Sequence, residues 1–174
     1  MKVSSNCVLI LIFFYLLTGC SSYDSPKYVR IANDITMKTA GKLNDQAQLH
    51  LAGIGGGMMD NVQMMAMMLD YYNEVEFKKA RELIVYVVNT YLEEINNNIE
   101  IRPYLVEYPF TARNVEVVIF FYCSEGISVP EGKIKIVAAK EGKIIYYIDQ
   151  PENDSIKAIY QETFEQAEHA LLEI

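Results

Sequence analysis

Apolar residues recur at helical spacing in four stretches of the chain. The clearest is 77–95, where they form one continuous stripe after the tetrapeptide NEVE at 73–76, which has the form of a helix-capping box. The triplet NNN at 96–98 would end this helix. The same spacing predicts a first helix from Pro26 to about Gly41, another over 60–72, and a last one from Asp154 or Ser155 to about Leu171.

Other stretches have the pattern of strands. Residues 48–54 alternate between apolar and polar, and 115–123 are rich in β-branched and aromatic side chains. Residues 133–139 and 143–148 flank the sequence KEGK, which is typical of a hairpin turn. Because hairpins take the place of alternating βαβ units, we expect one α+β domain over 27–174, with a mainly antiparallel sheet packed by amphipathic helices.

The first twenty residues, MKVSSNCVLILIFFYLLTGC, have the pattern of a secretory signal, with one lysine before an apolar run of eleven residues at 7–17. That run is too short to cross about 30 Å of hydrocarbon, which takes a helix of about twenty residues. It ends in Leu17-Thr18-Gly19-Cys20, which resembles the lipobox of bacterial lipoproteins. The resemblance implies removal of 1–19 as a signal peptide, acylation of Cys20 by palmitate or related chains, and a polar tether over 20–26.

The same resemblance predicts where the protein is found. We expect a lipid-anchored protein of the cell envelope, facing the periplasm or the cell surface. Ser21 follows the acylated cysteine, and in enteric-type sorting this favours the outer membrane.

Charge and cysteine content narrow the function further. The chain has a net charge of −8, and loss of Lys2 with the signal makes it −9, so nucleic acid and anionic headgroups are repelled. The membrane would be reached through lipid, and no nucleic-acid partner is expected.

Cys7 leaves with the signal and Cys20 is acylated, so Cys123 is the only remaining thiol and no internal disulfide can form. With no basic neighbour in sequence, Cys123 is interpreted as a buried, unreactive thiol.

Four of the nine glycines lie in LAGIGGGMMD, residues 51–60. A phosphate-binding loop needs a lysine that this stretch lacks, and a dinucleotide fingerprint needs glycine where Met58 or Asp60 stands. We therefore expect Gly55, Gly56 and Gly57 to form a structural turn, through positive φ or a tight passage. The alternative is a ligand-binding turn that also uses His50, although Asp60 would repel an anion at the helix that follows.

Six methionines lie between positions 58 and 68, and soft sulfur ligands select copper(I). No histidine interrupts the run, and Ala66 and Leu69 place it on an amphipathic stripe, so flexible core packing is favoured over a metal site. No metal and no cofactor is expected. His50 with Asp60 and Asp70 could form an acid–base site, but a partly buried strand histidine is favoured.

The segment INNNIEIRPYLVEYPFTARN, residues 95–114, has more proline, aromatic residues and arginine than a connector needs. It resembles a recurrent IN-N…RPYL…YPFT segment of uncharacterised bacterial lipoproteins and secreted proteins. With GIGGGMM upstream, the resemblance covers most of the mature chain, and it implies no activity. In the favoured interpretation Arg102 and Arg113 hold glutamates of the helices. Alternatively, a recognition surface would use residues of the types that dominate binding hot spots, namely Arg102, Tyr104, Tyr108, Phe110 and Arg113.

Taken together, these features predict an envelope lipoprotein whose α+β domain acts as a non-catalytic binding module, with another protein as partner. A carrier of a small ligand or of copper, built around the glycine turn and the methionine helix, is the alternative. An enzyme is the least supported class, because no G-x-S-x-G motif occurs and the chain has only two histidines.

Overall fold

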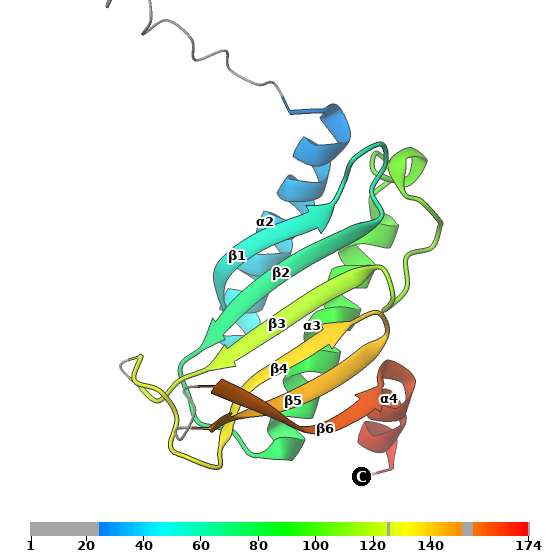
Figure 1. The fold of residues 1–174 in the computed structure, drawn as a ribbon. Coiled ribbons are helices and arrows are strands. Elements are labelled where there is room, and N and C mark those ends of the chain that lie inside the picture. The colour runs from blue at the N-terminus through cyan, green and yellow to red at the C-terminus, as the bar shows by residue number, and fades with distance from the viewer. Residues whose placement is uncertain (1–24, 125, 151–154, 174) are drawn as a thin grey trace, which may run out of the picture.

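The computed structural model describes residues 25–124, 126–150 and 155–173. The signal peptide and Cys20 lie outside these ranges. Helices and strands follow one another as α2 (Lys27–Ala47), β1 (His50–Gly57), β2 (Met64–Tyr71), α3 (Phe77–Asn97), the short 3-10 helix η1 (Arg102–Tyr104), β3 (Val115–Phe121), β4 (Ile134–Lys140), β5 (Lys143–Gln150), β6 (Ser155–Thr163) and α4 (Phe164–Leu172) (Figure 1).

The six strands form one sheet in the order of the sequence, β1-β2-β3-β4-β5-β6. Every neighbouring pair is antiparallel except β2 and β3, which are parallel. Parallel strands need a long crossover, and α3 with the segment after it supplies one here. The predicted α+β fold with a mainly antiparallel sheet is confirmed.

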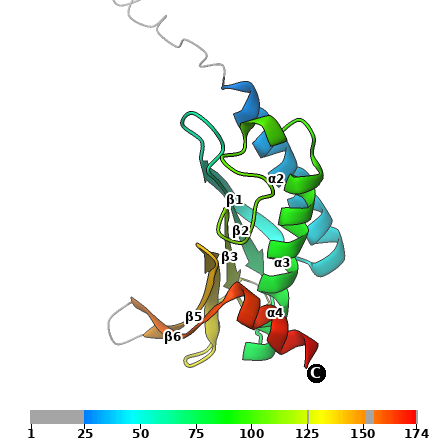
Figure 2. The ribbon, with the colours of Figure 1, turned by 90° about the vertical axis from the view of Figure 1, so that its right-hand side faces the viewer.

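The molecule has two layers. The long helices α2 and α3 lie side by side on one face of the sheet, and α4 lies beside α3 (Figures 1 and 2). On β3 the alternate residues Val115, Val117, Ile119 and Phe121 are buried toward these helices. Burial of this single layer of apolar side chains supplies most of the driving force for folding.

Helix α2 is longer than its sequence pattern predicted. It continues through Gly41 and ends at Ala47, where Gln48 takes the left-handed conformation and its N–H donates to the carbonyl of Asn44. Gly41 is exposed, so its cost is only the intrinsic one of about 1 kcal/mol. Leu43, two residues nearer the end, is fully buried and keeps the helix on the sheet.

The predicted helix over 60–72 is wrong, because this stretch contains strand β2. Met65 and Leu69 have the spacing of a helix, but Met67 between them is also fully buried, and the three together have the period of a strand. Pairing on both sides, with β1 and β3, decides between the two periods. Asp60 lies in the loop between β1 and β2 rather than at a helix start.

The last predicted helix is also wrong in its first half. Residues from Ser155 form strand β6, which pairs along its length with β5, and α4 begins only at Phe164. Its true start is a capping box: the N–H of Gln166 donates to the hydroxyl of Thr163, and the Gln166 side chain accepts from the N–H of Thr163. The sequence T-F-E-Q at 163–166 carries this capping signal.

The helix predicted over 77–95 is present as α3, but the tetrapeptide NEVE at 73–76 does not cap its start as a capping box would. The acids of NEVE do not cap it, and Glu76 at its N-cap position makes no side-chain capping bond. Glu74 and Glu76 instead both pair with Lys133, at 2.8 Å each. The hairpin of β4 and β5 is confirmed, with Glu141 and Gly142 both at positive φ, as a two-residue turn requires.

Candidate binding surface

One face of the sheet carries no helix. In Figure 1 this face is toward the viewer and the helices lie behind it, and Figure 2 shows the same two layers edge-on. We call this surface the open face. The residues on it alternate with the core positions on the strands, and on β1 to β5 they include Gly53, Gly55, Ala66, Met68, Asp70, Glu116, Val118, Phe120, Ile136, Ala138, Ile145 and Tyr147.

Two cross-strand rows form the centre of the open face. The first joins Met68, Val118, Ala138 and Ile145, which face one another on β2 to β5. The second joins Asp70, Phe120, Ile136 and Tyr147 on the same strands. All of these side chains are half-buried by their neighbours except Met68, which is 41% exposed. Apart from Asp70 the two rows are apolar or aromatic, so water covers a continuous apolar area.

Two pairs of opposite charges lie on the open face, and Asp70 belongs to neither. Lys140 lies 3.2 Å from the carboxylate of Glu116, and Lys135 lies 2.7 Å from that of Asp149. The face is therefore close to neutral, although the chain carries a charge of −8. Isolated exposed pairs contribute little to stability, at about 0–1 kcal/mol each. Their consequence here is that the two pairs add no net charge to the face, which leaves Asp70 as the charged group of the two central rows.

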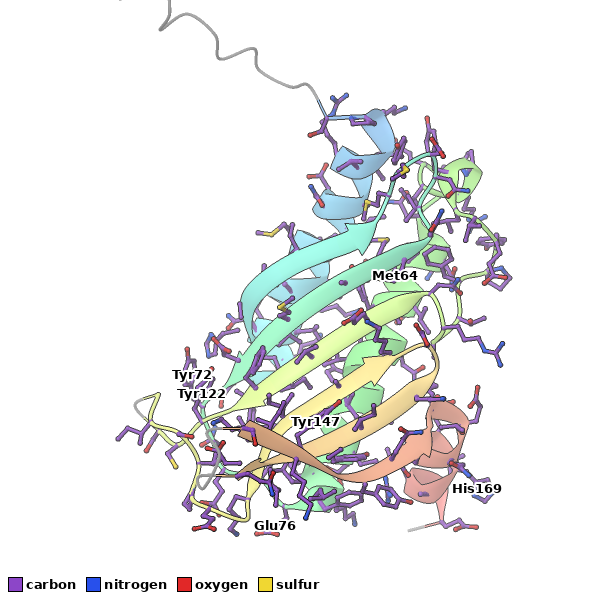
Figure 3. All side chains as sticks on the ribbon, in the orientation of Figure 1. Met64, Tyr72, Glu76, Tyr122, Tyr147 and His169 are labelled. Carbon is purple, nitrogen blue, oxygen red and sulfur yellow. The ribbon has the colours of Figure 1, made fainter. Side chains whose placement is uncertain are left out.

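One corner of the face is aromatic and polar. The rings of Tyr72 and Tyr122 stack at 5.7 Å, and the ring of His50 lies 5.3 Å from that of Tyr72 (Figure 3). Partial burial, followed by the nearby carboxylate of Asp70, raises the pKa of Tyr122. His50 is exposed rather than partly buried, and it stands opposite Asp70. Asp60 lies beyond the other end of β1, so the proposed cluster of His50 with both acids is not assembled.

The glycines do not form a turn. Gly55, Gly56 and Gly57 are the last residues of strand β1, and the glycines at positive φ are Gly126, Gly132 and Gly142. Close approach does apply to Gly56, where a Cβ would lie 2.7 Å from the carbonyl oxygen of Met64. At Gly55 and Gly57 a Cβ would meet only ordinary contacts, at 3.7 Å or more. Without side chains, this end of β1 leaves the open face flat.

The methionines divide between the two sides of the sheet. Met65 and Met67 are fully buried in the core, which confirms core packing for these two, whereas Met64 and Met68 belong to the opposite face. The thioethers of β2 therefore do not converge on one point. Among the residues that the structure describes, no three histidine, cysteine, aspartate or glutamate side chains are grouped as metal ligands.

The segment after α3 is held by its own side chains. The amide of Asn96 donates to the carbonyl of Phe110 at 2.9 Å and accepts from the N–H of Phe110 at 2.8 Å. The guanidinium of Arg102 donates twice to the carbonyl of Asn96, at 2.9 and 3.1 Å, and so satisfies the end of the helix. Asn114 closes the segment, because its side chain accepts from Thr111 and donates to Glu107.

These contacts show where the five residues of that segment lie. Arg102 has a structural role, but its partner is a backbone carbonyl and not a glutamate, and Tyr108 lies under its guanidinium at 4.8 Å. Phe110 is buried and belongs to the core. Tyr104 packs on Tyr28, with ring centroids 5.6 Å apart.

Arg113 has different neighbours from the other four residues. It is exposed near the start of α4, where it helps to lower the pKa of Glu165, after the backbone and the Thr163 hydroxyl. The structure therefore does not bring the five residues together on one surface.

An arginine that does hold a glutamate is Arg81 on α3. Its guanidinium makes two bonds of 2.9 Å to the carboxylate of Glu162 on β6, whose side chain is only 3% exposed. The hydroxyl of Tyr146 donates to the same carboxylate at 2.6 Å. Burial, followed by the Glu162 carboxylate, raises the pKa of Tyr146. Sequence spacing could not find this trio, because its members are up to 81 residues apart.

Cys123 is half-buried just beyond β3, and its Sγ lies 3.9 Å from the carbonyl oxygen of Ser128. Over the described part of the chain, no helix is long and apolar enough to cross a membrane. Comparison with family models, with curated proteins and with solved structures finds no match.

Proposed function

We propose that this protein is a lipoprotein of the bacterial cell envelope, anchored through acyl chains on Cys20, and that its domain binds another protein without catalysing a reaction. The anchor is supported by the sequence that ends in Leu17-Thr18-Gly19-Cys20. The binding role is supported by the open face, an apolar sheet surface with no helix on it. Large exposed apolar areas on soluble domains commonly mark interaction sites.

The size of the open face suits a protein partner. Six strands about 4.8 Å apart, each seven to nine residues long at about 3.3 Å per residue, span roughly 24 by 25 Å, or about 600 Å². A standard protein–protein interface covers about 800 Å² on each partner, of which the apolar centre is a part. Small ligands instead occupy concave sites that enclose most of their surface.

The charges of the open face narrow the chemistry of the partner. Because Glu116 and Asp149 are already paired with lysines, no excess charge is left in their part of the face to attract a basic or an acidic surface. The partner surface should therefore be apolar at its centre and close to neutral. Tyr72, Tyr122 and His50 supply a polar, aromatic rim at one corner, which is typical of interface borders.

A carrier of copper or of a small ligand has less support. It would need thioethers that converge, but neighbouring methionines of β2 lie on opposite faces of the sheet. The corner with His50 and Asp70 offers one histidine and one carboxylate, which is fewer ligands than a tight transition-metal site uses.

Photo-cross-linking in intact cells tests the binding role. A photoreactive amino acid is placed at Met68, which is 41% exposed on the open face, and in a matched control at Met37, which is 54% exposed on α2. We expect one discrete adduct with another protein from position 68 and none from position 37. The purified partner should then bind the wild-type domain and lose at least tenfold in affinity for Phe120→Lys, with the thermal midpoint of that variant measured as the control.

Three outcomes would contradict the proposal. Equal labelling from positions 68 and 37 would mean that the open face has no preference. An adduct only with a second copy of the chain would make the face a dimer contact instead. Absence of any adduct at Met68 and at a second position, Tyr147, would leave the face without an occupant.

A further inference from the structure

One end of the molecule gathers three segments that are distant in sequence. They are the first turn of α2, the loop at 58–63 between β1 and β2, and the segment at 102–106, all at the top of Figures 1 and 2. The hydroxyl of Tyr28 donates to the carbonyl of Met59 at 2.8 Å. The N–H of Val62 donates to Tyr104 at 2.8 Å, and that of Val106 donates back to Val62 at 3.0 Å. We call this the anchor end.

Apolar side chains stand in water at the anchor end. Met59 is 85% exposed, although its neighbour Met58 packs against the core. Val106 is 49% exposed on the adjacent segment. Both are fixed in place, because the carbonyl of Met59 accepts from Tyr28 and the N–H of Val106 donates to the carbonyl of Val62. The fold therefore presents two apolar side chains on an ordered surface, without covering them.

The length of the chain before α2 brings this end close to the proposed anchor. Only five residues, 21–25, separate Cys20 from Pro26, so six Cα–Cα steps join them and the backbone cannot span more than about 22 Å. Acyl chains on Cys20 would hold the anchor end within that distance of the headgroups. This step rests on the proposed acylation, which is the first part of the proposed function.

We propose that the anchor end docks on the lipid surface, with Met59 and Val106 entering the headgroup region. Tyr28 and Tyr104, which pack on each other beneath them, have the amphipathic character of residues at membrane interfaces. Charge permits the approach, because the three segments contain the bases Lys27, Arg30 and Arg102 and a single acid, Asp60. The opposite end is unsuitable, since α4 and the residue that follows it carry Glu165, Glu168 and Glu173 and no lysine or arginine. Docking would hold the long helices upright. The plane of the open face would then stand perpendicular to the bilayer, and the face would point sideways.

A single tryptophan reports on this contact, because the chain contains none. Met59→Trp is placed in the full-length acylated protein, and Leu172→Trp, 84% exposed at the end of α4 at the opposite end of the molecule, is the matched control. Both are reconstituted in phosphatidylcholine vesicles with a minor share of phosphatidylglycerol, with and without brominated acyl chains. Val106→Trp is an independent second reporter at the anchor end.

We expect the emission of Met59→Trp and Val106→Trp to shift to shorter wavelength on vesicles, with quenching by bromine several-fold stronger than for Leu172→Trp. Protein that floats with the vesicles while all three reporters are quenched alike would overturn the docking and leave the anchor intact. Protein that does not float at all would overturn the anchor, and with it the docking. The two failures are thus distinguished in the same experiment.

Discussion

At the scale of single residues, Gly56 is the glycine of β1 whose small size the fold requires. A Cβ there would lie 2.5 Å from the methyl end of Met58, which can move, and 2.7 Å from the carbonyl oxygen of Met64, which is part of the adjacent strand. We expect Gly56→Ala to lower the free energy of unfolding by about 1–3 kcal/mol. Gly55→Ala is the control, because its Cβ would make an ordinary contact of 3.7 Å with Ala66. Urea denaturation that gives equal losses for both variants would show that the close approach is not limiting.

The buried pair of Arg81 and Glu162 is a second site where one residue has a large effect. Removing the guanidinium leaves a carboxylate that is 3% exposed without its partner, so Arg81→Met should cost about 3–5 kcal/mol. Lys79 is two residues earlier on the same helix and pairs with Glu82 in solvent, so Lys79→Met should cost no more than about 0.5 kcal/mol. Chemical denaturation of both variants measures the difference. A small loss for Arg81→Met would mean that water reaches Glu162 in the folded protein.

Two buried tyrosines predict how stability depends on alkaline pH. Burial raises the pKa of both Tyr91 and Tyr146 in the folded protein. Below the unfolded pKa of about 10 both states are protonated, and the free energy of unfolding does not change with pH. Above that pKa only the unfolded tyrosine ionises, so the free energy of unfolding falls by about 1.4 kcal/mol per pH unit for each group. Urea denaturation between pH 8 and pH 11 should show a flat region and then this decline. Tyr91→Phe should reduce the slope, and a slope that it leaves unchanged would contradict the assignment.

At the scale of elements, the sequence correctly predicted the helices and strands whose apolar residues fit only one period. The stripe of α3 runs over five turns, and β3 to β5 combine β-branched residues with a hairpin signal. The errors fall on β2 and β6, where apolar residues satisfy a helical and a strand period at once. Pairing selects the strand in both cases, of β2 with β3, which is distant in sequence, and of β6 with β5.

The candidate surface was predictable to a smaller extent. The glycines and methionines are unusual in the sequence itself. Their location on or beside one sheet face cannot be deduced from it, because a one-residue change of register exchanges the two faces. The open face itself is defined by where helices are absent, which depends on the handedness and packing of the whole chain. The segment at 95–114 is unusual in composition too, but its side chains bond mostly to backbone groups, and composition cannot predict such bonds.

That segment gives a prediction at the element scale. Asn96 makes two hydrogen bonds to the backbone of buried Phe110, and Asn96→Ala would leave that N–H and carbonyl unpaired. A loss of about 2–4 kcal/mol is expected, since each unsatisfied buried group costs about 1–3 kcal/mol. Asn97→Ala, at the exposed next position, should be nearly neutral. Hydrogen exchange of the amides at 105–112 should rise only in the Asn96 variant, and equal exchange in both would show that the segment is held by other contacts.

At the scale of the whole molecule, the two proposed surfaces have compatible directions. The anchor end is the end at which α2 begins, and the open face runs along the length of the strands between that end and α4 (Figure 1). A domain held by one end at a bilayer would therefore keep the open face accessible to a partner beside it. If the membrane contacted the open face instead, the same apolar area could not serve a protein.

The last prediction concerns the anchor, on which this arrangement depends. Cys20→Ala should abolish labelling by palmitate and release the protein from the membrane fraction as a precursor or a soluble form, because two or three acyl chains are what holds it there. Cys123→Ala is the matched control, since Cys123 is the other thiol of the mature chain, and it should remain labelled and membrane-bound. The thermal midpoint of the released domain should equal that of the wild type, because its core is built from residues after position 25. Labelling that persists in Cys20→Ala, or that is lost in Cys123→Ala, would place the lipid elsewhere and separate the anchor end from the membrane.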